Sequence, residues 1–228
     1  MQKPQIQESS IRYLQLLKNN NNRPWFTSHK DMFIQAQHNL EMFADALLAE
    51  LNLHDLIETP TGKKSLHRIY RDTRFSADKR PYKNNWSGNF TRATKLRRGG
   101  YYFHIEPGNS FVAGGFWNPN PPDIKRIRDE IAFDATPLRK ILTSKSFISS
   151  FGKLQGEQLK TAPKGFDISN EAIDLLRYKQ FLLIRKFTNK EVLDTSFIKQ
   201  ASMTFRNMRP FFDYMSEVLT TDVNGVAL

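Results

Sequence analysis

The sequence contains no cysteine in its 228 residues, and this absence excludes several kinds of chemistry. Disulfides, thiolate zinc sites and cysteine nucleophiles all need that side chain. The absence fits a reducing compartment, and we expect a cytoplasmic protein.

Long apolar runs are absent as well. No run approaches the roughly 20 residues of a membrane-spanning helix, and Met1–Gln5 lacks the apolar start of a signal peptide. We therefore expect a soluble protein without a membrane partner. A hydrophobic content of 39% and an aromatic content of 12% predict a globular chain rather than a disordered one.

Familiar catalytic and cofactor motifs are also missing. The sequence has no Gly-x-x-x-x-Gly-Lys phosphate loop, no Gly-x-Gly-x-x-Gly, no Gly-x-Ser-x-Gly elbow and no His-Glu-x-x-His. No pattern therefore indicates a cofactor, and the sequence leaves open whether the protein is an enzyme.

Apolar periodicity predicts helices towards both ends of the chain. A first helix ends in the asparagine run 19–22, which we expect to affect only a loop. Thr27 or Ser28 can cap a second helix, whose apolar residues recur at steps of three and four. A long amphipathic helix is predicted at about 195–220. We expect Pro210 to kink or break it, because proline removes a helical hydrogen bond and clashes with the preceding turn.

Alternation of apolar and polar residues over 101–117 predicts two antiparallel strands. The turn residues 107–109 favour a three-residue loop, which sets Ile105 opposite Phe111 and gives the hairpin one apolar face. A two-residue loop would instead set Ile105 opposite Ser110.

The opposite face of this hairpin is predicted to be polar. Tyr102, His104 and Glu106 share it at two-residue spacing. Gly114 is expected on the same face, where the lack of a side chain leaves room for a close approach.

The order of these elements predicts the fold class. Helices come first, then strands, then strands and helices mixed, without strict βαβ alternation. This order indicates an α+β protein with a mainly antiparallel sheet packed with several helices. Residues 181–187, apolar on both faces, predict a central strand. We expect one domain over 1–228, with a helical part at about 9–55, a sheet-containing part at about 63–190 and the C-terminal helix. The alternative is two subdomains that divide near residue 60.

Positive charge is concentrated in one short stretch. Residues 61–100 hold twelve Lys and Arg and two Asp, a net +10 of the chain's +11. Aromatic residues alternate with these charges. The concentration predicts a binding site for anions.

We predict that the centre of this stretch forms a pocket for a small phosphorylated or otherwise anionic ligand. Arginine offers a rigid bidentate fork for such groups, and a helix start near 76–79 would add N–H donors. Tyr82 and His104 are expected to line the pocket, and Asp72 and Asp78 to hold the basic side chains in place. The predicted ligand-binding residues are Arg68, Arg71, Asp72, Arg74, Asp78, Lys79, Tyr82 and Lys83.

Two other interpretations of the basic stretch stay open. Its charges and aromatic residues suit a nucleic-acid partner, although no RNA- or DNA-binding signature is present. Alternatively, the charges pair locally on a solvated segment. The local pairs would be Asp72 with Arg68, Arg71 or Arg74, and Asp78 with Lys79 or Lys83.

His104 and Glu106 are the candidate catalytic residues. A histidine beside a carboxylate can act as a general base with its orienting partner, which would suit a hydrolase or a phosphotransfer enzyme. The same two residues could be a simple hydrogen-bonded pair, or Glu106 could pair with an arginine of the basic stretch. They could also be metal ligands together with His67 or Asp72. Because two residues at this spacing are common by chance, we predict no metal site.

Several segments together resemble one known family. Asn21–Lys30, Arg68–Lys83, Tyr101–Gly108, Gly114–Trp117, Lys160–Phe166 and Arg209–Phe211 are similar to the bacterial and fungal domain-of-unknown-function 2461 family. The similar segments occur in order and span most of the chain. The resemblance implies a single-domain soluble protein, and it carries no catalytic assignment to transfer to these positions.

Overall fold

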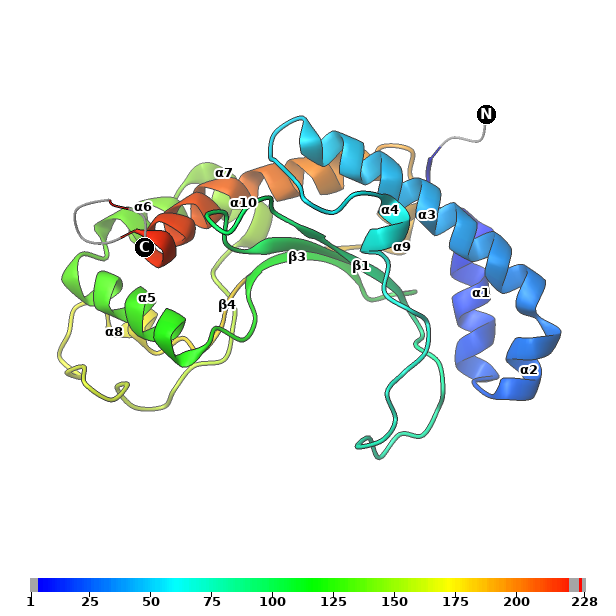
Figure 1. The fold of residues 1–228 in the computed structure, drawn as a ribbon, viewed down its shortest axis with the longest axis horizontal. Coiled ribbons are helices and arrows are strands. Elements are labelled where there is room, and N and C mark those ends of the chain that lie inside the picture. The colour runs from blue at the N-terminus through cyan, green and yellow to red at the C-terminus, as the bar shows by residue number, and fades with distance from the viewer. Residues whose placement is uncertain (1–3, 222–225, 227–228) are drawn as a thin grey trace. The chain divides into compact units, whose positions relative to one another are not determined.

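The computed structural model describes residues 4–221 and 226, which form helices and one β-sheet (Figure 1). The four antiparallel strands lie in the order β1-β2-β3-β4, and the α+β class is confirmed. No helix in this part of the chain is long and apolar enough to cross a membrane. The strands are β1 (Trp86–Thr91), β2 (Gly100–Ile105), β3 (Ser110–Phe116) and β4 (Phe181–Phe187). The helices are α1 (Glu8–Asn19), α2 (Arg23–Ser28), α3 (Lys30–Asn52), α4 (Gly62–Ser65), α5 (Pro121–Phe133), α6 (Thr136–Leu142), α7 (Lys145–Phe151), α8 (Ile173–Leu176), α9 (Asn189–Leu193) and α10 (Phe197–Thr220).

The chain divides into two compact units, each built from three segments. The first division falls after Phe90 rather than near residue 60, and a single domain over 1–228 stays a prediction. Unit 1 comprises Met1–Phe90, Tyr102–Val112 and Lys186–Met203, and unit 2 comprises Thr91–Tyr101, Ala113–Arg185 and Thr204–Leu228.

Strand β4 lies at the end of the sheet order, so the predicted central position of 181–187 was wrong. Its outer edge is nevertheless covered in part by Gln155. The Gln155 N–H donates to Leu182 O at 2.9 Å, and the Leu182 N–H donates back to Gln155 O at 2.8 Å. Phe181 and Leu183 are fully buried on one face and Leu182 is 7% exposed on the other, which explains an apolar composition on both faces of an end strand.

The β2–β3 hairpin has a two-residue loop, so the predicted three-residue loop was wrong. The Asn109 N–H donates to Glu106 O at 2.9 Å and closes a tight turn. Ile105 and Ser110 consequently both lie on the buried face. Ser110 fits there because its hydroxyl donates to Glu106 O at 2.9 Å and accepts from Glu106 N–H at 3.1 Å. Ser110 therefore lies opposite Ile105 on the buried face, where the apolar pattern had predicted Phe111.

The shorter loop moves every β3 side chain to the face opposite the predicted one. Phe111 lies on the polar face and stacks on His104 with a centroid separation of 4.7 Å. Gly114 lies on the buried face, where a Cβ would come within 2.6 Å of Met208 Sδ and 2.7 Å of Phe212 Cζ. The prediction of Gly114 beside His104 was wrong, and its missing side chain serves core packing.

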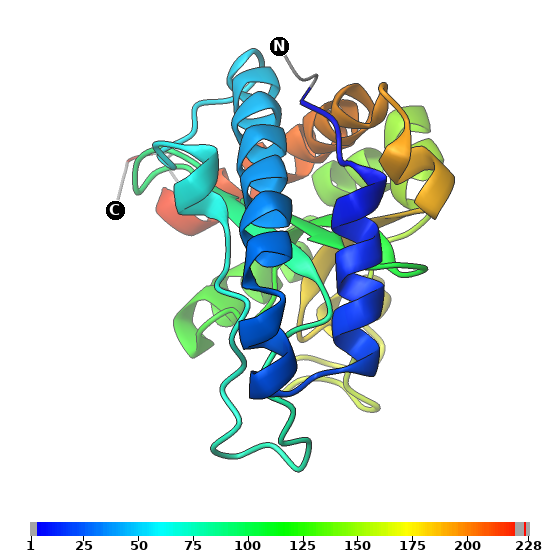
Figure 2. The same cartoon turned by 90° about the vertical axis from the view of Figure 1, so that its right-hand side faces the viewer.

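Helices α1 and α3 lie side by side in unit 1 (Figure 2). Asn39 of α3 joins them through three hydrogen bonds. Its Oδ1 accepts from Gln7 N–H and the Ser10 hydroxyl, both at 2.9 Å, and its Nδ2 donates to Gln5 O at 2.9 Å. This buried amide fixes the start of α1 against α3.

The predicted second helix consists of two helices, α2 and α3, which meet at His29. Thr27 and Ser28 lie inside α2, so the prediction that they cap the long helix was wrong. The cap of α2 is Asn22, whose Oδ1 accepts from Trp25 N–H at 3.0 Å.

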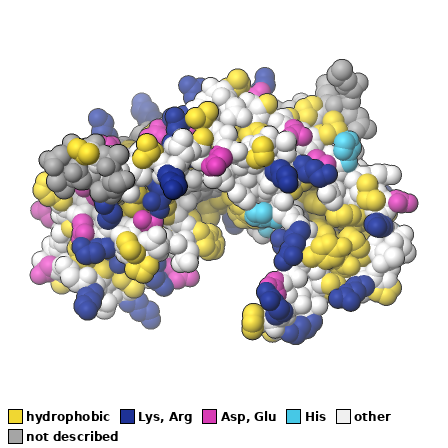
Figure 3. Space-filling view, viewed as in Figure 1, with side chains coloured by type: hydrophobic (Ala, Val, Ile, Leu, Met, Phe, Trp, Pro, Cys, Tyr) yellow, Lys and Arg dark blue, Asp and Glu magenta, His cyan; other side chains and the backbone are white. Residues whose placement is uncertain are grey.

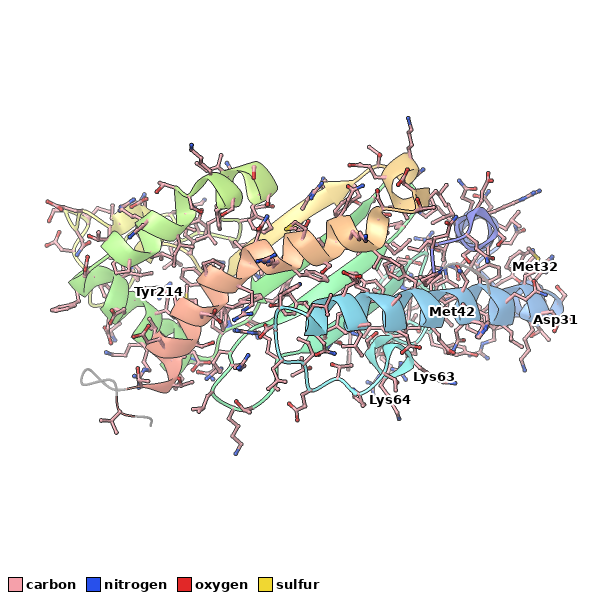
Figure 4. All side chains as sticks on the ribbon, turned by 90° about the horizontal axis from the view of Figure 1, so that it is seen from above. Asp31, Met32, Met42, Lys63, Lys64 and Tyr214 are labelled. Atoms are coloured by element: carbon pink, nitrogen blue, oxygen red, sulfur yellow. The ribbon has the colours of Figure 1, made fainter. Side chains whose placement is uncertain are left out.

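Helix α4 leads the chain out of α3 towards the basic stretch. The Gly62 N–H donates to Asp45 Oδ1 of α3 at 2.5 Å. A Cβ on Gly62 would lie 2.2 Å from Asp45 N, so only glycine allows this approach. Lys63 lies 3.8 Å from Glu41, and Figure 4 shows Lys63 and Lys64 on α4 alongside α3.

Helix α10 continues across Pro210, so the predicted break there does not occur. Proline in a helix interior costs about 3 kcal/mol. Burial of one large apolar side chain offsets roughly 1.5–3 kcal/mol. The fully buried residues on both sides of Pro210 are Phe205, Met208, Phe211, Phe212 and Met215. Their combined burial outweighs the cost of the proline, and the helix is retained.

Candidate functional site

The basic stretch forms a long, narrow hairpin, residues 66–85, which we call the arm. In Figure 1 it extends away from the helices of unit 1 between α4 and β1. Its two sides pair through the Arg71 N–H, which donates to Pro81 O at 2.9 Å, and the Lys83 N–H, which donates to Ile69 O at 2.8 Å. Figure 3 shows basic side chains along the arm, with basic, acidic and apolar side chains at its end.

Tyr82 anchors the arm to unit 1. Its ring is only 4% exposed and stacks on Phe26 at 4.1 Å, and Tyr70 packs against it at 5.4 Å. Asn21 holds the backbone of the same residue: its Nδ2 donates to Tyr82 O and its Oδ1 accepts from Tyr82 N–H, both at 3.0 Å. Burial raises the pKa of Tyr82. Tyr82, which was predicted to line a ligand pocket, therefore anchors the arm to unit 1.

Two Asp-x-Arg sequences shape the end of the arm. Asp72 accepts from Arg74 Nε at 3.0 Å and from Nη2 at 2.7 Å, one of the local pairs considered from the sequence. Asp78 pairs with Arg80 at 2.7 Å and Arg71 at 2.5 Å, so the predicted partners Lys79 and Lys83 were wrong. In both sequences the carboxylate also accepts the arginine N–H two residues later. This repeated two-residue spacing was the sequence signal that could have identified Arg80 as the partner of Asp78.

These pairs change the acidity of both carboxyl groups. Hydrogen bonds from Arg74 lower the pKa of Asp72, and hydrogen bonds from Arg80 followed by Arg71 lower the pKa of Asp78. Both carboxylates therefore stay charged at neutral pH, and the arginines beside them are held by local partners.

Arg68 and Lys83 are placed differently from the paired arginines. Within residues 4–221 and 226, neither side chain forms a hydrogen bond or an ion pair. The pKa of Lys83 is lowered by burial first and by the positive charge of Arg68 second. Lys79 by contrast donates to Thr73 O at 3.0 Å. Arg68 and Lys83 are consequently the predicted ligand-binding cations that have no partner in the described chain.

A second feature is a row of polar side chains on β1, β2 and the start of the arm. His104 lies at its centre: Nδ1 is 3.1 Å from the Tyr102 hydroxyl, and Nε2 is 3.1 Å from Glu106 Oε2. The side chains of His104 and Glu106 are 12% and 23% exposed. The sequence prediction that Tyr102, His104 and Glu106 share one face is thus confirmed by their contacts.

The row continues beyond Tyr102 to Ser87, which the sequence analysis did not assign to it, and to His67, which it considered only as a metal ligand. Ser87 forms a hydrogen bond with Tyr102, and its hydroxyl lies 3.3 Å from His67 Nδ1. His67 Nε2 lies 2.8 Å from Asn89 Oδ1. The alternation of Ser87 and Asn89 with apolar residues along 86–91 was a signal for this polar strand face. We call His67, Ser87, Tyr102, His104 and Glu106 the polar row.

Burial raises the pKa of Tyr102, and the hydrogen bond with Ser87 opposes that shift. The phenol therefore keeps its proton at neutral pH and can donate it. A carboxylate can only accept, so His104 Nε2 carries the proton towards Glu106. In the neutral imidazole, Nδ1 is then the acceptor for the Tyr102 hydroxyl.

A pocket of about 530 Å³ opens at the Glu106 end of the polar row. Three segments that are distant in sequence form it: the end of α1, the arm and the β2–β3 turn. Its volume falls in the range of roughly 300–1,000 Å³ that is usual for small-molecule sites. The lining residues are Leu14, Gln15, Lys18, Asn19, Asn84, Glu106 and Pro107.

The pocket brings together groups of both charges. Glu106 contributes a carboxylate whose Oε2 is held by His104 at 3.1 Å and Asn109 Nδ2 at 3.0 Å. Lys18 contributes an ammonium group, and Asn84, which lines the same pocket, accepts from Asn21 Nδ2 at 3.0 Å. Within the part of the chain that the structure describes, no three His, Asp or Glu residues form a group that could hold a metal ion.

The fold and the polar row define an α+β protein with a hydrogen-bonded tyrosine–histidine–glutamate row beside a pocket. The chain belongs to the family described as conserved hypothetical protein DUF2461, whose model matches residues 9–214. This confirms the resemblance, and the arm, the polar row and the pocket all lie within the matched range. No curated protein and no solved structure matches the chain.

Proposed function

We propose that the protein is an enzyme that performs general acid–base chemistry of the hydrolytic type on a small anionic substrate. The observation that carries this proposal is the hydrogen-bonded chain Tyr102–His104–Glu106, which ends in a carboxylate on the wall of a pocket. Such a chain can orient a base and stabilise the charge that it acquires.

The pocket supports roles opposite to those expected from the sequence. The sequence suggested His104 as the base and Glu106 as its orienting partner. Glu106 lines the pocket, and His104 and Asn109 hold its Oε2, so Glu106 Oε1 is the oxygen available to a substrate. Glu106 is therefore the proposed general base, with His104 and Tyr102 as positioning residues behind it.

The proposed step is the activation of water. Glu106 takes a proton from a water molecule, the resulting hydroxide attacks the electrophilic centre of the substrate, and the same proton passes to the leaving group. Lys18, on the same pocket, would bind the anionic group of the substrate and offset the charge that develops during attack. The hydrogen bond from His104 Nε2 keeps the carboxylate in position throughout.

A panel of chromogenic phosphate and carboxylate esters tests this proposal. We expect turnover of at least one class, and a loss of about 100-fold or more in kcat for Glu106→Gln, the usual scale of general-base catalysis. Glu58→Gln, an exposed carboxylate in the same unit, is the matched control. Absence of turnover across the panel, or equal rates for Glu106→Gln and Glu58→Gln, would sink the proposal.

A second candidate function is the binding of a small phosphorylated or other anionic ligand by the arm. Arg68 and Lys83 favour it, because two cations without partners among the described residues repel each other and an anion would relieve that repulsion. Thermal-shift titration with phosphate, a nucleoside diphosphate and polyphosphate tests it against an ionic-strength control. No stabilisation beyond that control would remove this candidate.

A further inference from the structure

The end of the arm exposes a large apolar side chain. Phe75 is 97% exposed, and the guanidinium Cζ of Arg74 lies 5.9 Å from its ring centroid. Tyr70, nearer to the base of the arm, is 52% exposed. An exposed phenyl ring contributes nothing to the core, and at the end of the arm it is accessible to a partner.

The backbone that carries Phe75 is held in place on both sides. Towards the base, Tyr82 stacks on Phe26 and is hydrogen-bonded by Asn21. Towards the end, Asp72 and Asp78 fix Arg74 and Arg80. The aromatic surface is therefore presented on a largely preformed scaffold, which lowers the entropy lost when a partner binds.

The charge of the arm selects an anionic partner. Residues 66–85 contain six Lys and Arg and two Asp, a net charge of +4. Both acidic residues are engaged with arginines, whereas Arg68 and Lys83 have no partner within the described residues. Basic side chains thus occur on either side of both exposed aromatic rings, along a stretch that is long enough to contact several phosphates.

We propose that the arm binds single-stranded nucleic acid, with unpaired bases stacking on Phe75 and Tyr70 and phosphates contacting the basic side chains. A protruding ring needs a partner with accessible π-faces, which an unpaired strand offers and a duplex hides. An acidic protein would satisfy the charge but offers a stacking surface only where it carries an aromatic or arginine side chain, whereas every base of a single strand offers one. The exposed rings and the basic side chains together therefore favour single-stranded nucleic acid over a duplex and over an acidic protein.

Fluorescence anisotropy with a labelled single-stranded oligonucleotide of mixed sequence tests the proposal on the full chain. Phe75→Ala should weaken binding about 5- to 150-fold, the range found when a stacked aromatic is removed. Phe133→Ala is the matched control, because Phe133 is 88% exposed and lies in unit 2. Equal affinities of these two variants would overturn the proposal.

The salt dependence tests the charged part separately. The double variant Arg68→Gln/Lys83→Gln should reduce the slope of log K against log salt by about 1.4, or about 0.7 for each lost phosphate contact. The exposed pair Lys153→Gln/Lys160→Gln should leave the slope unchanged. A slope near zero for the unmodified chain, or preferential binding of a duplex or of an acidic peptide, would also overturn the proposal.

Two further measurements separate this inference from the proposed functions. Glu106→Gln should bind the oligonucleotide as the unmodified chain does, because Glu106 lies in the pocket and not on the arm. Free phosphate and a mononucleotide should compete much less well than the oligonucleotide at equal phosphate concentration. Equal competition would leave only the small-anion site and overturn the single-strand proposal.

Discussion

Asn21 holds the arm on unit 1, and its removal gives a sharp test of that anchoring. Asn21→Ala deletes three hydrogen bonds of 3.0 Å each: to Tyr82 O, from Tyr82 N–H and to Asn84 Oδ1. A typical net hydrogen bond contributes about 1 kcal/mol, and a buried backbone group left unpaired costs about 1–3 kcal/mol. Tyr82 is only 4% exposed, so water can replace the lost bonds only in part. We expect a loss of about 2–4 kcal/mol in the free energy of unfolding.

Urea unfolding followed by tryptophan fluorescence measures this loss, and amide exchange at Tyr82 shows whether it is local. Asn22→Ala is the control, because Asn22 caps α2 and its loss should cost about 1 kcal/mol. The reasoning is refuted if Asn21→Ala is no more destabilising than Asn22→Ala, or if the exchange rate at Tyr82 is unchanged.

Two further predictions concern the core of unit 2 and the pH dependence of the arm. Gly114→Ala should cost about 1–3 kcal/mol in thermal unfolding because its Cβ would press on Met208 and Phe212. Met208→Ala should then destabilise the Gly114→Ala variant less than it destabilises the unmodified chain, because it removes one of these two contacts. The pKa of Asp78 is lowered in the folded state, so its stabilisation is present above the unfolded value of about 4 and is lost as pH falls through the folded value. Amide exchange along the arm, corrected for its intrinsic pH dependence, should therefore rise below about pH 4, and Asp78→Asn should show the same rise at neutral pH. Exchange unaffected by either change would contradict the assigned role of Asp78.

Patterns that span only a few residues predicted much of the candidate site. Tyr102, His104 and Glu106 share a face because side chains alternate along a strand, and no knowledge of the partner strand is needed for that conclusion. Asp72 reaches Arg74 because the two residues are two apart and their turn is local. The concentration of positive charge in residues 61–100 likewise identified the stretch that contains the arm.

The errors arose where a residue's environment depends on distant parts of the chain. The predicted register of β3 was wrong because it assumed that a polar residue such as Ser110 would not lie on the buried face. The hydroxyl of Ser110 forms two hydrogen bonds with the backbone of Glu106 in the turn, and these allow the side chain to be buried. The asparagine run 19–22 was expected to affect only a loop. Instead Asn19 lines the pocket, Asn21 holds Tyr82 and Asn22 caps α2.

The sequence by itself determined the α+β class, the amphipathic helices, the concentration of positive charge in one stretch and the shared face of His104 and Glu106. These features follow from periodicity and charge within single segments. Only the tertiary structure decided that Glu106 opens onto a pocket with Lys18, that Tyr82 is an anchor and that α10 continues through Pro210. Each of these outcomes depends on burial and hydrogen bonding between segments far apart in sequence, and such contacts exist only once the chain has folded.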